Sequence, residues 1–126
     1  MMRRRMRLFA LRGAVTVDRN ASEDILGATE WLMHEIMQRN ELVTEDVVSC
    51  LFTLTDDLDA EFPAVAARRL GFDQVPLMCA REVPVPGSLP RVIRVLMHYY
   101  AAEDHHARHV YLGDARKLRA DLDSAQ

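Results

Sequence analysis

The chain has 126 residues, a length typical of one domain with a modest hydrophobic core. Apolar residues make up 49% of it and charged residues 28%, which is an ordinary globular balance. The formal net charge of -3 argues against a general nucleic-acid-binding surface, because such a surface needs a basic excess to displace counterions. No apolar stretch approaches the ~20 residues that a membrane-spanning helix requires, so we expect no membrane partner either.

The N-terminus and the cysteines indicate the compartment. Residues 1–6 are rich in arginine and lack the apolar segment of a secretory signal peptide, so we expect a disordered basic leader. Cys50 and Cys79 lie in apolar surroundings, without a CxxC motif or metal-ligand spacing. Such thiols are typical of free, buried cysteines in a reducing compartment, and we therefore expect a cytoplasmic protein.

The first predicted elements are a strand and a long helix. Residues 7–17 alternate apolar and polar side chains, which predicts a strand in which Gly13 permits a bend or a close approach. The string Asn20-Ala21-Ser22-Glu23 has the form of a capping box, and the helix after it should run to about Arg39. The inward face of this helix would carry Ile25, Ala28, Thr29, Leu32 and Ile36.

Two strands and a short helix follow. Residues 47–54 are rich in β-branched and apolar side chains, which predicts a buried strand. Residues 62–71 predict a short helix, with Pro63 in its first turn and Gly71 at its C-terminal cap. Residues 75–79 form another short apolar run and are interpreted as a strand.

The last third of the chain completes the sheet. The prolines and glycine of residues 84–90 predict an irregular loop. Residues 92–100 fit a helical period as well as a strand, and their β-branched and aromatic content favours the strand. Residues 109–112 predict a final strand. One domain over residues 7–118 and a mobile tail over 119–126 would follow. The order β-α-β-α-β-β-β predicts an α/β (α+β) fold, a mixed sheet with helices on one face.

Two arginines stand inside apolar, strand-like runs. Arg12 ends the run Leu8 to Leu11, and Arg94 interrupts a run of valine, isoleucine, leucine and methionine. Because burying an unpaired charge is unfavourable, each arginine needs an anionic partner, which is either a carboxylate of the protein or an anionic ligand. The alternatives are a strand-end arginine that reaches water for Arg12, and an ion pair in the core for Arg94.

A group of histidines could indicate a metal site. His105, His106 and His109 lie near Glu103 and Asp104. A metal site would require this stretch to be helical, with converging ligands from elsewhere in the chain. Because the stretch lies between two predicted strands, a solvated turn is the favoured interpretation.

Four strings carry a resemblance to a known family. They are LRGAVTV at 11–17, FPA at 62–64 with Arg68, VPLMCARE at 75–82, and IRV at 93–95 followed by RHVYL at 108–112. In this order and spacing they resemble the monofunctional chorismate mutases of the Bacillus type, over about residues 8–122. The resemblance implies a homotrimer whose sheets pack into a pseudo-α/β-barrel, with active sites between subunits. It also implies conversion of chorismate to prephenate without metal or cofactor.

That reaction is a pericyclic rearrangement of a dianion, in which negative charge grows on an ether oxygen, so it needs fixed cations and donors. By the resemblance, Arg94 faces the ether oxygen and one carboxylate, and Arg12 binds a carboxylate. Glu82 accepts a hydrogen bond from the ring hydroxyl, Cys79 touches the same region, and Tyr111 donates to a carboxylate. Arg94, Glu82 and Arg12 would be the catalytic residues.

The neighbouring subunit would add Phe62 to the apolar wall and Arg68 beside a carboxylate. The alternatives are plain core positions for Phe62 and Cys79, a solvated arginine for Arg68, and an aromatic anchor for Tyr111. The rival function is a non-catalytic trimeric small-molecule-binding protein on the same scaffold, because a fold does not fix a function.

Overall fold

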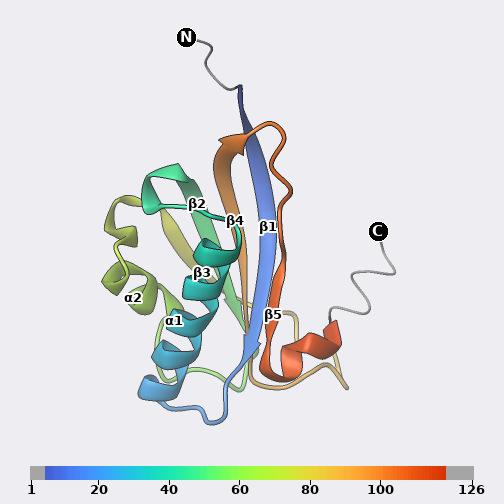
Figure 1. Cartoon of the computed structure of the whole chain (residues 1–126). Coiled ribbons are helices and arrows are strands. Elements are labelled where there is room, and N and C mark those ends of the chain that lie inside the picture. Colours follow the sequence, from blue (N-terminus) through green and yellow to red (C-terminus); the bar gives the residue numbers. More distant parts are fainter. Residues whose placement is uncertain (1–4, 119–126) are drawn as a thin grey trace.

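The computed structural model describes residues 5–118. The main elements in chain order are β1 (Met6–Thr16), α1 (Ser22–Arg39), β2 (Val47–Leu54), α2 (Pro63–Arg69), β3 (Leu77–Arg81), β4 (Val92–Ala102) and β5 (Val110–Leu112) (Figure 1). They are joined in part by the one-turn 3₁₀ helices η1 (Thr44–Asp46), η2 (Phe72–Gln74) and η3 (Gly113–Ala115). The predicted order of strands and helices is confirmed. The predicted leader and tail lie outside the described residues, except Arg5 and Met6. Within residues 5–118, no helix combines the length and apolar character of a membrane span.

The strands form one mixed sheet in the order β3-β2-β4-β1-β5. The central strand β4 is antiparallel to both of its neighbours, β1 and β2, whereas β3 is parallel to β2 and β5 is parallel to β1. Figure 1 shows α1 and α2 together on one face of this sheet. The predicted mixed sheet with helices on one face is therefore confirmed.

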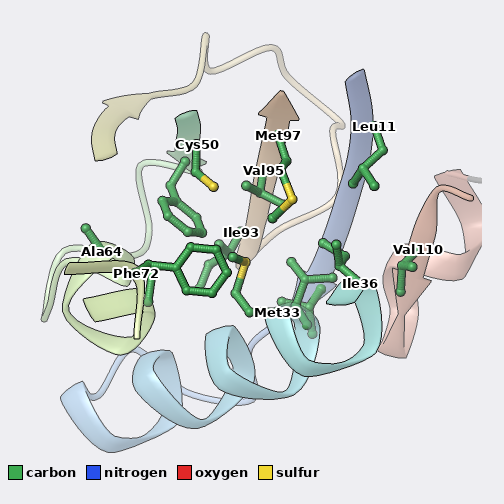
Figure 2. Packing of buried hydrophobic residues seen from close by; sticks show 14 of the residues in the cluster. Leu11, Met33, Ile36, Cys50, Ala64, Phe72, Ile93, Val95, Met97 and Val110 are labelled. Carbon is green, nitrogen blue, oxygen red and sulfur yellow. The ribbon is translucent and has the colours of Figure 1, made fainter. Parts of the chain in front are cut away.

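The hydrophobic core fills the space between the sheet and the helices. Leu32, Met33 and Ile36 of α1 are fully buried and pack against the inward side chains of the strands (Figure 2). The layers approach closely at Gly13, where an added Cβ would lie 2.7 Å from Cδ1 of Ile36. The close approach predicted for Gly13 is confirmed. Because Gly13 has no side chain, α1 can pack closely against the sheet at this point.

The start of α1 differs from the predicted capping box. Ala21 is the N-cap and makes no side-chain capping hydrogen bond. Asn20 instead reaches across to the β2–α2 connection, where its Nδ2 donates to Asp59 Oδ1 over 2.8 Å. Its Oδ1 accepts hydrogen bonds from the backbone N–H groups of Asp59 and Ala60, at 3.0 and 3.1 Å. The Asn20 side chain therefore makes a tertiary contact, whereas the local sequence pattern predicted that it would cap the helix.

The short strands are shifted relative to their predicted bounds. β3 begins at Leu77, two residues later than expected, because η2 and Pro76 occupy the preceding positions. Pro76 has no N–H to donate, although its carbonyl accepts the Cys50 N–H at 3.1 Å. The ambiguous run from Val92 is a strand and extends to Ala102.

Both cysteines are free thiols, as the sequence predicts. Cys50 is buried between the sheet and the helices, and this burial raises the pKa of its thiol to about 12. Cys79 is only half-buried and packs at the margin of the core.

A candidate active site on the open face of the sheet

The candidate site lies on the open face, by which we mean the face of the sheet that α1 and α2 leave uncovered. Side chains alternate along a strand, so Arg12 and Ala14 of β1 point away from the buried Leu11 and Val15. The strand register then aligns Tyr111, Ala14, Arg94 and Thr53 in one row across β5, β1, β4 and β2. Chemistry-bearing residues from distant parts of the sequence meet in this row.

An ion pair lies on the open face, near the start of the central strand β4. Arg94 Nε donates to both carboxylate oxygens of Glu82, at 3.1 and 3.0 Å. The Arg94 side chain is 39% exposed and the Glu82 side chain 16%. Arg94 therefore has a carboxylate of the protein as a partner, and it still faces solvent, from which an anionic ligand could bind. Both kinds of partner predicted from the sequence are compatible with this position.

Glu82 is fixed through its backbone and through a third side chain. It follows β3 directly, and its N–H donates to the Leu54 carbonyl over 2.9 Å, so it continues the pairing of β3 with β2. Thr53 Oγ1 donates to Glu82 Oε2 over 2.7 Å. A guanidinium and a hydroxyl therefore hold the same carboxylate.

Arg12 and Tyr111 complete the polar part of this face. The Arg12 side chain is exposed, two residues along β1 from Ala14, and its backbone N–H donates to His109 Nδ1 over 3.0 Å. Tyr111 is half-buried and packs against a small cluster that includes Ala14, Val92 and Ala115. The structure thus places Arg12, Glu82, Arg94 and Tyr111 on one face.

Cys79 is the predicted site residue that the structure places elsewhere. It is the register partner of Phe52, a fully buried residue, and it packs against the core on the helix-covered face. Glu82 is three residues further along, and an odd separation on an extended chain turns two side chains to opposite faces. The Cys79 thiol therefore does not reach the carboxylate of Glu82, and the alternative of a core position is the one observed.

Phe62 and Arg68 lie on the other layer of the molecule. Phe62 is the N-cap of α2 and is 66% exposed, so its interpretation as a plain core residue is wrong. Arg68 lies in the last turn of α2 and is exposed. Because α2 covers the opposite face of the sheet, this chain does not bring either residue to its own open face (Figure 1).

Two cavities of the described residues lie at opposite ends of the sheet, and neither encloses this face. A cavity of about 230 Å³ lies next to Glu82 and is lined mainly by the 83–90 loop and by Thr55, Asp56 and Asp57. A larger cavity of about 450 Å³ lies at the other end of the sheet, beside Tyr100 and His105. Arg12 and Arg94 line neither of these two. The charged side chains of the open face are therefore accessible to a molecule that covers this face.

Sequence reasoning missed Thr53. Its signal is a single hydroxyl residue between Phe52 and Leu54, two apolar residues that are both buried. In a strand that alternation assigns Thr53 to the face opposite the core, and hence to the face of Arg94. The identity of its partner, however, depends on where the chain after β3 turns.

His105 is built into the fold, whereas His106 is exposed. The His105 ring packs edge-on against the rings of Phe9 and Tyr99, with ring centroids 5.0 and 5.4 Å away. Its Nε2 lies 2.8 Å from Tyr99 Oη, at hydrogen-bond distance. Among residues 5–118, no three histidine, cysteine or acidic side chains are grouped so as to hold a metal ion.

Two cations, a carboxylate and a phenol on an uncovered sheet face are groups that can bind a small anionic molecule. The comparisons with known proteins specify the family. The sequence pattern of chorismate mutase type I matches residues 8–122, and this chain belongs to that family.

Relatives and a solved structure agree with this assignment. The chain is 48% identical over 118 residues to the chorismate mutase AroH of Thermus thermophilus, covering 92% of this chain and 97% of that protein. It is 42% identical over 119 residues to the AroH of Bacillus subtilis, covering 93% and 94%. The solved chorismate mutase of Clostridium thermocellum superposes with a TM-score of 0.82 at 44% identity, covering 86% of this chain and 98% of that one. The resemblance found in the sequence is confirmed.

Proposed function

We propose that this protein rearranges chorismate to prephenate on its open sheet face. The observation that supports the proposal most is the Arg94–Glu82 pair on that face, in a chain of the chorismate mutase type I family. Curated relatives at 48% and 42% identity carry the name of the same enzyme. The rival function, a binding protein without catalysis, has no observation in its favour.

The chemistry suits a rigid electrostatic site. The substrate breaks its ether bond and forms a carbon–carbon bond within one molecule, so the protein supplies no nucleophile and accepts no proton. Arg94 would donate to the ether oxygen as its negative charge grows and to one carboxylate. Arg12 and Tyr111 would hold carboxylates, and Glu82 would accept a hydrogen bond from the ring hydroxyl. Together these contacts would select the compact conformer that reacts.

We also propose a homotrimer with one site at each boundary between copies. The open face is left uncovered within one chain, whereas Phe62 and Arg68 are displayed on the other layer. A neighbouring copy could therefore bring Phe62 and Arg68 to the face that holds Arg94, which would enclose the substrate. Two free thiols are consistent with our placing the protein in the cytoplasm.

The test is the loss of chorismate absorbance with purified protein and no added metal. The wild-type protein should accelerate the reaction, and Arg94→Ala should lower kcat by about a hundredfold or more, because it removes a preorganised donor. Arg39→Ala is the matched control, since Arg39 also pairs with a glutamate, Glu35 at 2.7 Å, but on the surface of α1. This control should keep the wild-type rate.

Two results would contradict the proposal. A wild-type protein that leaves chorismate unchanged would overturn the function itself. Equal rates for wild-type protein and Arg94→Ala would overturn the arginine-centred mechanism. Because no group changes its protonation in the reaction, kcat should also stay flat between about pH 6 and 9.

A further inference from the structure

We propose that Thr53 is a positioning residue, which holds Glu82 and through it aims Arg94 at the substrate. The inference rests on the proposed function and adds a residue to its machinery. Thr53 would not touch the reacting atoms. Its hydroxyl would fix the carboxylate against which the arginine is oriented.

The geometry places Thr53 behind the ion pair. Thr53 is the register partner of Arg94 in the antiparallel pairing of β2 with β4, so the two side chains leave the sheet next to each other on the same face. Thr53 Oγ1 lies 2.7 Å from Glu82 Oε2. Side chains of two neighbouring strands therefore bind the same carboxylate, β2 through the Thr53 hydroxyl and β4 through the Arg94 guanidinium.

The ion pair leaves the two terminal nitrogens of the Arg94 guanidinium available to a substrate. Within residues 5–118, the hydrogen bonds of the Arg94 side chain to Glu82 both come from Nε. The two terminal nitrogens are thus directed past the carboxylate, and the side chain is 39% exposed. A carboxylate that swung toward the terminal nitrogens would compete with an anionic substrate for the same donors.

Thr53 is the contact that opposes this swing. A glutamate side chain has three rotatable bonds, so a single ion pair leaves the carboxylate several ways to face a guanidinium. The second anchor at Oε2 removes most of them. Threonine suits the task because its branched side chain has few rotamers and fits a strand.

The experiment compares Thr53→Val, which keeps the shape and removes the hydroxyl, with Thr53→Ser, which restores it. Thr53→Val should lower kcat about tenfold while KM changes less than about threefold, because the lost bond orients a charged group and does not contact substrate. Thr53→Ser should return kcat to within about twofold of the wild-type value.

The chain offers a matched control in Thr44→Val. Thr44 Oγ1 also donates to a glutamate, Glu45 Oε1 at 3.2 Å, but it lies in η1, away from the ion pair. This variant should keep the wild-type kcat and KM. It measures what the loss of a threonine–glutamate hydrogen bond does elsewhere in the chain.

The outcomes separate this inference from the function on which it rests. An active wild-type protein whose kcat is unchanged in Thr53→Val would overturn the inference alone. Equal losses in Thr53→Val and Thr53→Ser would also overturn it, since packing and not the hydroxyl would then be responsible. An inactive wild-type protein would overturn the proposed function itself, and the inference would fall with it.

Discussion

The same strands form both faces of the sheet, but different interactions dominate on each face. On the helix-covered face, Leu11, Phe52 and Met97 are fully buried and gain free energy from leaving water. On the open face, Arg12 and Arg94 remain partly in water and gain from charge and geometry. Of two adjacent residues in one strand, one therefore contributes to the core and the next contributes to the open face. Stability and activity should respond to different substitutions only one residue apart.

Phe52→Ala should have the largest effect on the core face. We expect it to lower the free energy of unfolding by about 3–5 kcal/mol, because it opens a cavity between the sheet and the helices. Urea unfolding followed by circular dichroism at one fixed protein concentration measures the change. Arg12→Ala, on the other face, should alter that free energy by less than about 1 kcal/mol. Similar losses in both variants would contradict the separation of the faces.

Arg12→Ala should act on the reaction instead. We expect kcat/KM to fall about 10–100-fold, mostly through KM, because a charged hydrogen bond to a substrate carboxylate is lost. The melting temperature should stay near that of the wild-type protein. Steady-state kinetics with chorismate measures the change, and a lower melting temperature with unchanged KM would assign Arg12 to the fold.

Gly13→Ala sharpens the comparison, because Gly13 lies next to Arg12 and faces the helix. The new Cβ would meet Cδ1 of Ile36 at 2.7 Å, and overpacking of this kind lowers stability by about 1–3 kcal/mol. Gly27→Ala is the matched control. Nothing lies within 4 Å of an added Cβ there, so the change should stabilise α1 by about 0.5–1 kcal/mol. Urea unfolding should show opposite signs for the two, and equal signs would contradict the tight fit at Gly13.

The last effect concerns alkaline pH. Burial raises the pKa of Cys50 from 9.0 to about 12 and that of Tyr99 from 10.0 to about 12. The folded state thus retains protons that the unfolded chain releases. Stability should be fully present below about pH 9 and should fall as the pH rises toward 12, by at most about 1.4 kcal/mol per pH unit for Cys50.

Urea unfolding of wild-type protein and Cys50→Ala at pH 8 and pH 10.5 tests this. The variant should lose less stability than the wild-type protein between the two values, because it lacks one of the two groups. Identical losses would show that Cys50 titrates in the folded state as it does in the unfolded chain.

Much of the fold could be predicted from the sequence because local patterns carry it. The apolar periodicity of α1 and the alternation along β1 each mark a buried face, and both elements lie where expected. The capping of α1 could not be predicted, since Asn20 is taken by a contact 39 residues away. Strand ends near Pro76 likewise depend on a neighbouring turn.

The candidate site shows the same limit. Arg94 and Glu82 could be found from the family strings, and the structure joins them in an ion pair. The resemblance implied a contact between Cys79 and the site, but the parity of β3 turns Cys79 to the core and Glu82 to the open face. Thr53 belongs to none of the four strings, and only the folding of β2 against the end of β3 brings it to the carboxylate.

The strand order has a consequence for synthesis of the chain. β1 lies between β4 and β5, so Met6 pairs with Ala102 and Gly13 with Val110. The first strand to leave the ribosome therefore has no partner until nearly the whole chain has followed, and such long-range pairing makes folding slow. A nascent chain that ends before β4 already contains Arg12 and Thr53, but it lacks the strand that would hold them on one face.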